Sequence, residues 1–127
     1  MPIEKVHRYT RAEIRARPGA LYAFGDNLAG RGFGGQAREA RGEPNAVGVV
    51  TKRRQAMDEG AFLTDADLPR VRPLIEAAFA RLREHLEAGG EVILPADGLG
   101  TGLAELPRRA PAIAALIEAG MEALRES

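Results

Sequence analysis

Three short apolar runs, each followed at once by glycine or polar residues, constrain the fold of this chain more than any other feature. The runs cover residues 21–24, 46–51 and 92–94, and segments of helical character separate them. Short apolar runs of this kind are typical of strands buried on both faces. Strands joined by helical crossovers imply a parallel sheet with helices on both sides. The sequence therefore predicts an α/β fold, a three-layer α/β/α sandwich with a mainly parallel sheet.

Weaker signals complete the predicted order of elements. Residues 6–9 are predicted as a short edge strand, and residues 11–17 as a short helix that a Pro-Gly pair ends. A second short helix ends at about Arg41. Residues 52–63 have no clear period and are predicted as a loop over the carboxyl edge of the sheet. The last helix is expected over residues 107–124.

The longest helix carries the clearest signal. Thr64 and Asp67 form a capping-box pattern at its start. Apolar residues then follow at spacings of three and four up to Leu86, which gives one apolar stripe. Pro73 lies inside this span, so residues 68–72 are interpreted as a possible separate turn.

The composition fits one domain over residues 1–127 and excludes several kinds of protein. Hydrophobic residues make up 45%, enough for a real core, and 18 Lys+Arg balance 18 Asp+Glu. A neutral chain lacks the broad positive field of non-specific nucleic-acid binding. With no cysteine and two histidines without ligand spacing, no cofactor or metal is expected. No signal peptide and no apolar run near ~20 residues are present, which predicts a cytoplasmic protein without a membrane partner.

The carboxyl ends of the predicted strands are the expected place of a ligand site. In open α/β sheets, ligands bind beyond these ends. The first loop, GDNLAGRGFGGQA, contains Gly32, Gly34 and Gly35, which let the backbone approach a ligand closely. The last two lie near the start of a helix, where free N–H groups favour anions. A flexible linker is the alternative interpretation of this loop.

A second glycine-rich loop, ADGLGTGLAEL, follows the third strand. It has glycines at positions 98, 100 and 102 and again precedes a helix. Alone this signal is weak, but two such loops at one sheet edge can close over one diphosphate. The sequence therefore predicts a phosphate-bearing, nucleotide-like ligand.

Lys52 stands at the end of the second strand, in a chain with 16 arginines and only two lysines. An amine can lose its proton and attack a carbonyl-like carbon, which a guanidinium cannot do. Chance placement at a solvated position is the alternative. Asp26, Asp97 and Glu105 are the carboxylates in or beside the loops.

In these loops the chain resembles the macrodomain fold, the module that binds ADP-ribose. The matching segments are FGDNLAGRGFGGQA and LPADGLGTGLAEL. The order of motifs is most similar to the terminal ADP-ribose protein glycohydrolase branch, through VVTKRR, the long helix, VILP and GTGLAEL. The resemblance covers about residues 20–120. Short phage-type macrodomain-like proteins also have loops similar to FGDNLAGRG.

The resemblance implies binding of ADP-ribose or a related nucleotide diphosphate and hydrolysis of ADP-ribosyl modifications on a macromolecule. Asn27 is then expected to contact the distal ribose. Lys52 is expected to attack that ribose and form a covalent lysyl–ADP-ribose intermediate. The residues expected to bind the ligand, several through backbone N–H groups, are Gly25, Asp26, Asn27, Gly32, Gly34, Gly35, Thr51, Gly98, Gly100, Thr101, Gly102 and Leu103.

The chain departs from the family pattern at two places. Ala104 stands where that branch has the aspartate that resolves the intermediate, so Asp97 or Glu105 is expected to handle protons. The residues before Leu21 lack the Gly-Asp pair that contacts adenine in macrodomains, which leaves Asp26 as a candidate for that contact.

Two other hypotheses remain beside the hydrolase. Ala104 at the acid position favours a non-catalytic module that only binds ADP-ribose. The consecutive cations Lys52, Arg53 and Arg54 instead indicate a possible contact with nucleic acid, which the zero net charge does not favour.

Overall fold

The computed structural model describes residues 3–32, 36–54, 56–99 and 104–126 of the chain. Strands and helices alternate through most of this length. In chain order the elements are β1 (Ile3–Val6), α1 (Arg11–Ala16), β2 (Ala20–Asn27), α2 (Ala37–Ala40), β3 (Ala46–Lys52), η1 (Glu59–Ala61), η2 (Asp65–Asp67), α3 (Leu68–Glu87), β4 (Glu91–Pro95), α4 (Leu106–Arg109) and α5 (Pro111–Arg125).

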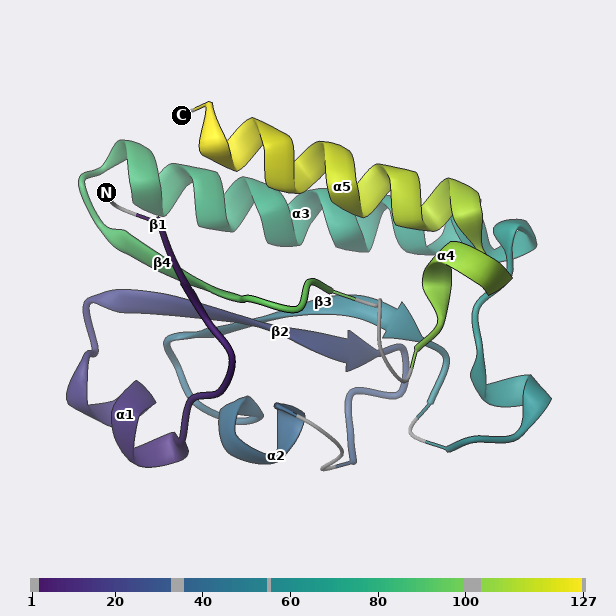
Figure 1. Cartoon of the computed structure of the whole chain (residues 1–127), viewed down its shortest axis with the longest axis horizontal. Helices are drawn as coiled ribbons and strands as arrows, with labels where there is room; N and C mark the ends of the chain where they lie inside the picture. Colours follow the sequence, from purple (N-terminus) through teal and green to yellow (C-terminus); the bar gives the residue numbers. More distant parts are fainter. Residues whose placement is uncertain (1–2, 33–35, 55, 100–103, 127) are drawn as a thin grey trace.

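The described strands form one parallel sheet in the order β1-β4-β2-β3. β2 lies inside the sheet and pairs with β3 over most of its length and with β4 at its start. Helices α3 and α5 cover one face, and α1 and α2 cover the other (Figure 1). The predicted α/β class and three-layer α/β/α arrangement are therefore confirmed.

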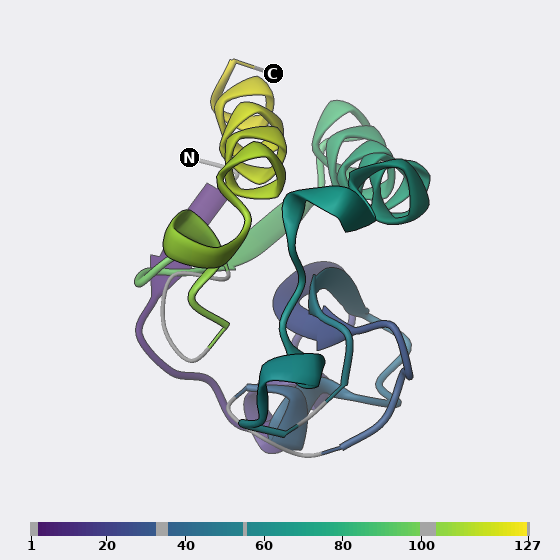
Figure 2. The same ribbon diagram turned by 90° about the vertical axis from the view of Figure 1, so that its right-hand side faces the viewer.

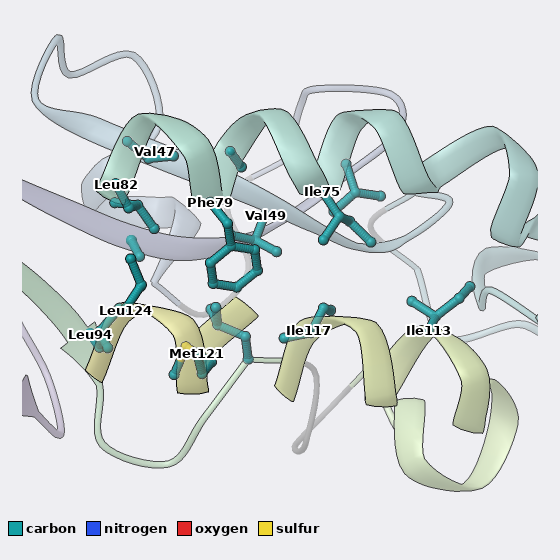
Figure 3. Close-up of a cluster of buried hydrophobic side chains, with 14 of the residues drawn as sticks. Val47, Val49, Ile75, Phe79, Leu82, Leu94, Ile113, Ile117, Met121 and Leu124 are labelled. Carbon is teal, nitrogen blue, oxygen red and sulfur yellow. The ribbon is translucent and has the colours of Figure 1, made fainter. Parts of the chain in front are cut away.

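The larger core lies between the sheet and helices α3 and α5. Alternate strand residues point to this face, as the two-residue period of a strand requires. Figure 3 shows how side chains from both helices and the sheet meet there. The labelled members of this core are Val47, Val49, Ile75, Phe79, Leu82, Leu94, Ile113, Ile117, Met121 and Leu124. Each fully buried aliphatic side chain contributes about 1.5–3 kcal/mol relative to exposure.

A smaller core fills the opposite face. Tyr22 and Phe24 of β2 point toward α1 and α2, and Tyr9 packs edge-on against Tyr22 with ring centroids 5.0 Å apart. The Tyr9 hydroxyl donates to the carbonyl of Ala23, and burial raises the pKa of Tyr9. The side-chain amide of Asn45 lies 2.9 Å from the carbonyl of Ile14 and 3.1 Å from that of Ala20. Asn45 therefore joins α1 to β2.

The strand boundaries differ from the sequence prediction at two places. β1 ends at Val6, so the predicted strand over residues 6–9 is wrong in its bounds, although β1 is an edge strand as expected. β2 continues to Asn27, so the predicted strand over residues 21–24 is too short, and the first three residues of the predicted loop belong to the strand. The reason is tertiary. β3 extends beside these residues and pairs with them up to Asn27↔Lys52.

Two helix predictions are wrong. α3 runs unbroken from Leu68, so residues 68–72 are not a separate turn; Pro73 and Pro69, whose carbonyl loses its helical partner, are both exposed. The predicted helix over residues 107–124 is divided into α4 and α5 at Ala110. Ala110 precedes a proline, which disfavours helical backbone, and its φ is −147°. The capping box of Thr64 and Asp67 is confirmed.

We expect Gly120→Ala to destabilise the protein, although alanine normally favours a helix interior. Gly120 lies on α5 directly against the Phe79 ring of α3, and a Cβ there would come 2.6 Å from a ring carbon. The expected loss is about 1–2 kcal/mol, because overcrowding outweighs the gain in helix propensity. Urea unfolding measures it. A Gly120→Ala protein that is more stable than wild type would show that the α3–α5 contact can relax.

The carboxyl ends of the strands meet at one side of the sheet. Figure 2 looks onto this side and shows α4 and the segment between β3 and α3 beside it. The fold thus places the strand-end residues singled out in the sequence at one edge.

Candidate functional site

Lys52 and Asn27 are register partners at the carboxyl ends of β3 and β2. The register shifts by one residue between Asp26 and Asn27, so Thr51 is the extra residue of a bulge on β3. A bulge changes which face the following side chain points to. Lys52 accordingly lies against Phe62, with which it also forms an isolated antiparallel bridge.

The amine of Lys52 is half-buried and lies near an aromatic ring, a backbone carbonyl and charged side chains. Its Nζ lies 4.6 Å from the centroid of the Phe62 ring and donates a hydrogen bond to the carbonyl of Ala56. Burial lowers the pKa of Lys52, while Asp58 and Glu105 act in the opposite direction. The Lys52 amine therefore loses its proton at a lower pH here than a lysine on an open surface does.

Four connected residues lie on the α4 side of the amine, and we call them the Phe62 cluster: Phe62, Arg109, which contacts the Phe62 ring, and Glu59 and Glu105, which pair with Arg109. The Arg109 guanidinium carbon lies 3.7 Å from the Phe62 ring centroid. Arg109 binds the Glu59 carboxylate through two hydrogen bonds of 2.8 and 3.2 Å. The cluster therefore holds an aromatic ring and a cation close to the Lys52 amine, and its Glu105 acts electrostatically on that amine.

Of the carboxylates predicted from the sequence, Glu105 is the one that acts electrostatically on Lys52. It precedes α4 with a left-handed backbone, φ 51°. Its hydrogen bond from Arg108 lowers the pKa of its carboxyl, so this group is ionised at neutral pH. A carboxylate in that state can accept a proton and is a poor donor.

Asp97, the other acid predicted to handle protons, is placed differently. It follows β4 and lies 3.5 Å from Nδ1 of His7, with both side chains highly exposed. β2 separates β4 from β3 in the sheet, so Asp97 and Lys52 leave from strands that are not neighbours.

Asp26 points to the α2 side of the sheet. Its carboxylate lies 2.7 Å from Arg41 and accepts a 2.7 Å hydrogen bond from the backbone of Asn27. Arg41 in turn donates to the carbonyl of Gly32, which has a φ of 104°. Asp26 and Arg41 therefore hold the beginning of the first glycine-rich loop against β2.

Gly25, Thr51 and Asn27 form the buried floor between the strand ends. A Cβ on Gly25 would lie 3.3 Å from the Thr51 hydroxyl, and this hydroxyl donates to the carbonyl of Asp26 at 3.2 Å. The Asn27 amide donates to the carbonyl of Arg31 at 2.8 Å. Its Oδ1 is buried and has no hydrogen-bond partner among the described residues.

Part of the predicted phosphate site lies outside the described residues. Gly98 is described and has a φ of 88°, a conformation that favours glycine. Beside it, a hollow of about 300 Å³ lies between the end of β4 and α5, lined by residues that include Leu99, Pro107 and Met121. The predicted residues outside the described part are Gly34, Gly35, Gly100, Thr101, Gly102 and Leu103.

The basic run next to Lys52 is neutralised within the protein. Arg53 binds Asp67 at 2.8 Å, and Arg54 binds Asp58 at 2.6 Å. These pairs leave less positive charge for a nucleic-acid backbone than the sequence suggested.

Sequence reasoning missed Phe62, Arg109 and Glu59. Phe62 lies in an apolar stretch within the segment that was predicted as a loop. Arg109 lies about 50 residues further along the chain. No spacing in the sequence connects these residues, because only the α4 turn brings them together.

A family model matches residues 4–120, which is most of the chain and includes every strand end described above except part of β1. The description of that family is "Family of unknown function (DUF7831)". The chain belongs to this family. No curated protein and no solved structure matches it.

The DUF7831 match spans the Phe62 cluster as well as Asn27 and Lys52. Over the described ranges of this family member, no helix is long and apolar enough to cross a membrane. Nor do three His, Asp or Glu side chains gather there in a way that could hold a metal ion.

Proposed function

We propose that this protein binds ADP-ribose or a related nucleotide diphosphate and removes ADP-ribosyl groups from a modified macromolecule, with Lys52 as nucleophile. The observation that carries the proposal is the register pairing of Lys52 with Asn27 at the carboxyl edge of a parallel sheet. The Lys52 amine, whose pKa is lowered, and the buried Asn27 amide therefore extend from paired backbone positions at this edge. In the family that the sequence resembles, the matching residues attack and hold the distal ribose.

The proposed reaction has two steps. In the first, the neutral amine of Lys52 bonds to the anomeric carbon of the distal ribose, and the bond from that carbon to the macromolecule breaks. The leaving group takes the electron pair, and the proton lost by the amine passes to the Glu105 carboxylate. In the second, water attacks the same carbon, the bond to Lys52 breaks with its electron pair returning to the nitrogen, and one proton of the water passes to that nitrogen. ADP-ribose then leaves with the amine restored, and Glu105 returns its proton to the leaving group or to solvent.

Glu105 fits the role of proton acceptor for Lys52 better than Asp97 does. It acts electrostatically on Lys52 and is ionised, so it can take up the proton that the amine loses, and its lowered pKa makes it a weaker base than an ordinary glutamate. Because the ionised Glu105 does not donate a proton readily, the favoured leaving groups are those that depart without acid help. Asp97 remains a candidate for contacts to the diphosphate loop. The proposed site of action is the cytoplasm.

A second candidate function is a module that binds ADP-ribose without turnover. Ala104 favours it, because this buried apolar residue stands where the resembled branch has a catalytic aspartate. Turnover of an ADP-ribosylated protein separates the two candidates.

The first test is calorimetric titration of the purified protein with ADP-ribose, with AMP as the control ligand. We expect saturable binding in the micromolar range that AMP does not reproduce, since AMP lacks the distal ribose and one phosphate. Absence of heat with ADP-ribose would contradict both the hydrolase and the binding module. A matched titration with Asn27→Ala is expected to weaken binding by roughly tenfold, the effect of one lost hydrogen bond to a buried amide.

A further inference from the structure

The Phe62 cluster holds a second cation close to the amine of Lys52. The Nζ of Lys52 and the guanidinium of Arg109 both lie against the Phe62 ring, 4.6 and 3.7 Å from its centroid. Phe62 is only 1% exposed, so the ring cannot move away easily. The two positive charges are therefore no more than about 8 Å apart, a distance at which they repel each other in a partly buried setting.

Arg109 is fixed in this position from three sides. Its side chain is 15% exposed, two of its nitrogens bind Glu59, and its Nε lies 3.6 Å from Oε1 of Glu105. Planar stacking on an aromatic ring and two-point binding of a carboxylate are the contacts that a guanidinium makes better than an ammonium. Arg108, one residue earlier, is 68% exposed and also binds Glu105, but no contact to Phe62 is seen.

We propose that Arg109 is a positioning residue, which favours the reactive neutral form of the Lys52 amine by placing a fixed positive charge across the Phe62 ring. The inference rests on the proposed role of Lys52 as nucleophile. It goes beyond that role by assigning a function to a residue of α4 that does not contact the reacting ribose.

The charged groups that face Lys52 determine the sign of the effect. Burial is the largest cause of the lowered pKa of Lys52. Asp58 and Glu105 raise this pKa, whereas Arg109 and Arg54 lower it further. Removing the charge of Arg109 also leaves Glu105 with Arg108 as its remaining cation. Both changes favour the protonated amine, so the pKa of Lys52 rises.

The experiment measures the titration of Lys52 in the protein alone. The chain has two lysines, so lysine-selective ¹³C labelling gives two side-chain signals, with Lys5 as the internal reference. We expect Arg109→Gln to move the midpoint of Lys52 upward by about 0.5 to 1 pH unit. Arg109→Met, which keeps the packing on Phe62 without charge, is expected to do the same, and Arg109→Lys to restore most of the wild-type value.

Arg108→Gln is the matched control, since it removes the same charge from the same helix. We expect it to produce less than half the shift of Arg109→Gln. The proposal is overturned if the neutral variants titrate at the wild-type midpoint, or if Arg108→Gln moves it as far. Should Arg109→Gln fail to fold, Arg109→Met and Arg109→Lys carry the comparison.

The same variants link the effect to turnover. If the protein hydrolyses ADP-ribosylated substrate, the pH at which its rate reaches half of the plateau moves upward with the Lys52 midpoint in Arg109→Gln. If no turnover occurs in wild type, the proposed function fails while the titration still decides whether Arg109 controls Lys52.

Discussion

Replacing Lys52 by alanine is expected to reduce turnover of an ADP-ribosylated protein at least about a thousandfold, because the covalent step loses its nucleophile. Binding of ADP-ribose is expected to change only a few-fold, since the amine contributes little to holding the diphosphate. Lys52→Arg is expected to be equally inactive. It keeps the charge but presents a group that does not lose its proton.

Lys5→Ala provides the control for this experiment. Lys5 is the other lysine of the chain and lies exposed on the edge strand β1. We expect wild-type turnover from Lys5→Ala. Intact mass spectrometry of wild type, stopped during turnover, is expected to show one ADP-ribose adduct that is absent from Lys52→Ala. Full activity of Lys52→Ala would exclude the covalent mechanism and leave only the ligand-binding part of the proposal.

Gly48→Ala is expected to cost about 2–3 kcal/mol of folding free energy, the largest stability effect that we predict for a single methyl group. Gly48 lies on β3 beside Asp26 of β2. A Cβ there would lie 2.9 Å from the Cβ of Asp26 and 2.6 Å from its carboxylate. The Cβ of Asp26 is fixed by its strand, so the two strands must separate near the site.

Gly19→Ala is the matched control, because nothing lies within 4 Å of a Cβ at Gly19. We expect its urea midpoint to stay near that of wild type. The double variant Asp26→Gly, Gly48→Ala is expected to be more stable than the sum of the single effects, since the crowding partner is removed. An unchanged midpoint for Gly48→Ala would mean that the β2–β3 spacing is softer than the structure implies.

Much of the fold follows from local patterns in the sequence. The stripe of α3 and its capping box are contained in one segment, so the period of three and four residues predicts them directly. The positions at which the strands after residues 20 and 45 begin also follow from patterns that lie within one segment. A local pattern does not reveal which strand will pair with a given segment. Gly25 and Asp26 have low strand preference, and they extend β2 only because β3 pairs with them.

The sequence predicts where the candidate site lies in the fold, but it does not predict which side chains contact one another there. The rule that ligands bind at carboxyl ends of parallel strands brought Asn27 and Lys52 together from sequence alone. It could not choose between Asp97 and Glu105, because that choice depends on strand order and on the turn before α4. Phe62 and Arg109 became visible only when side chains from distant segments were placed in space.

The position of β1 has a consequence for how the chain is made. β1 pairs with β4, from Ile3↔Val92 onward, so about 85 residues separate the two partners. At synthesis rates of about 5–20 residues per second, the first strand waits several seconds before its neighbour leaves the ribosome. During that time β2, β3 and the helix stripe of α3 are already available to one another. The order of synthesis therefore favours a nucleus built from the site-bearing strands, with the chain's first strand added last as the closing edge.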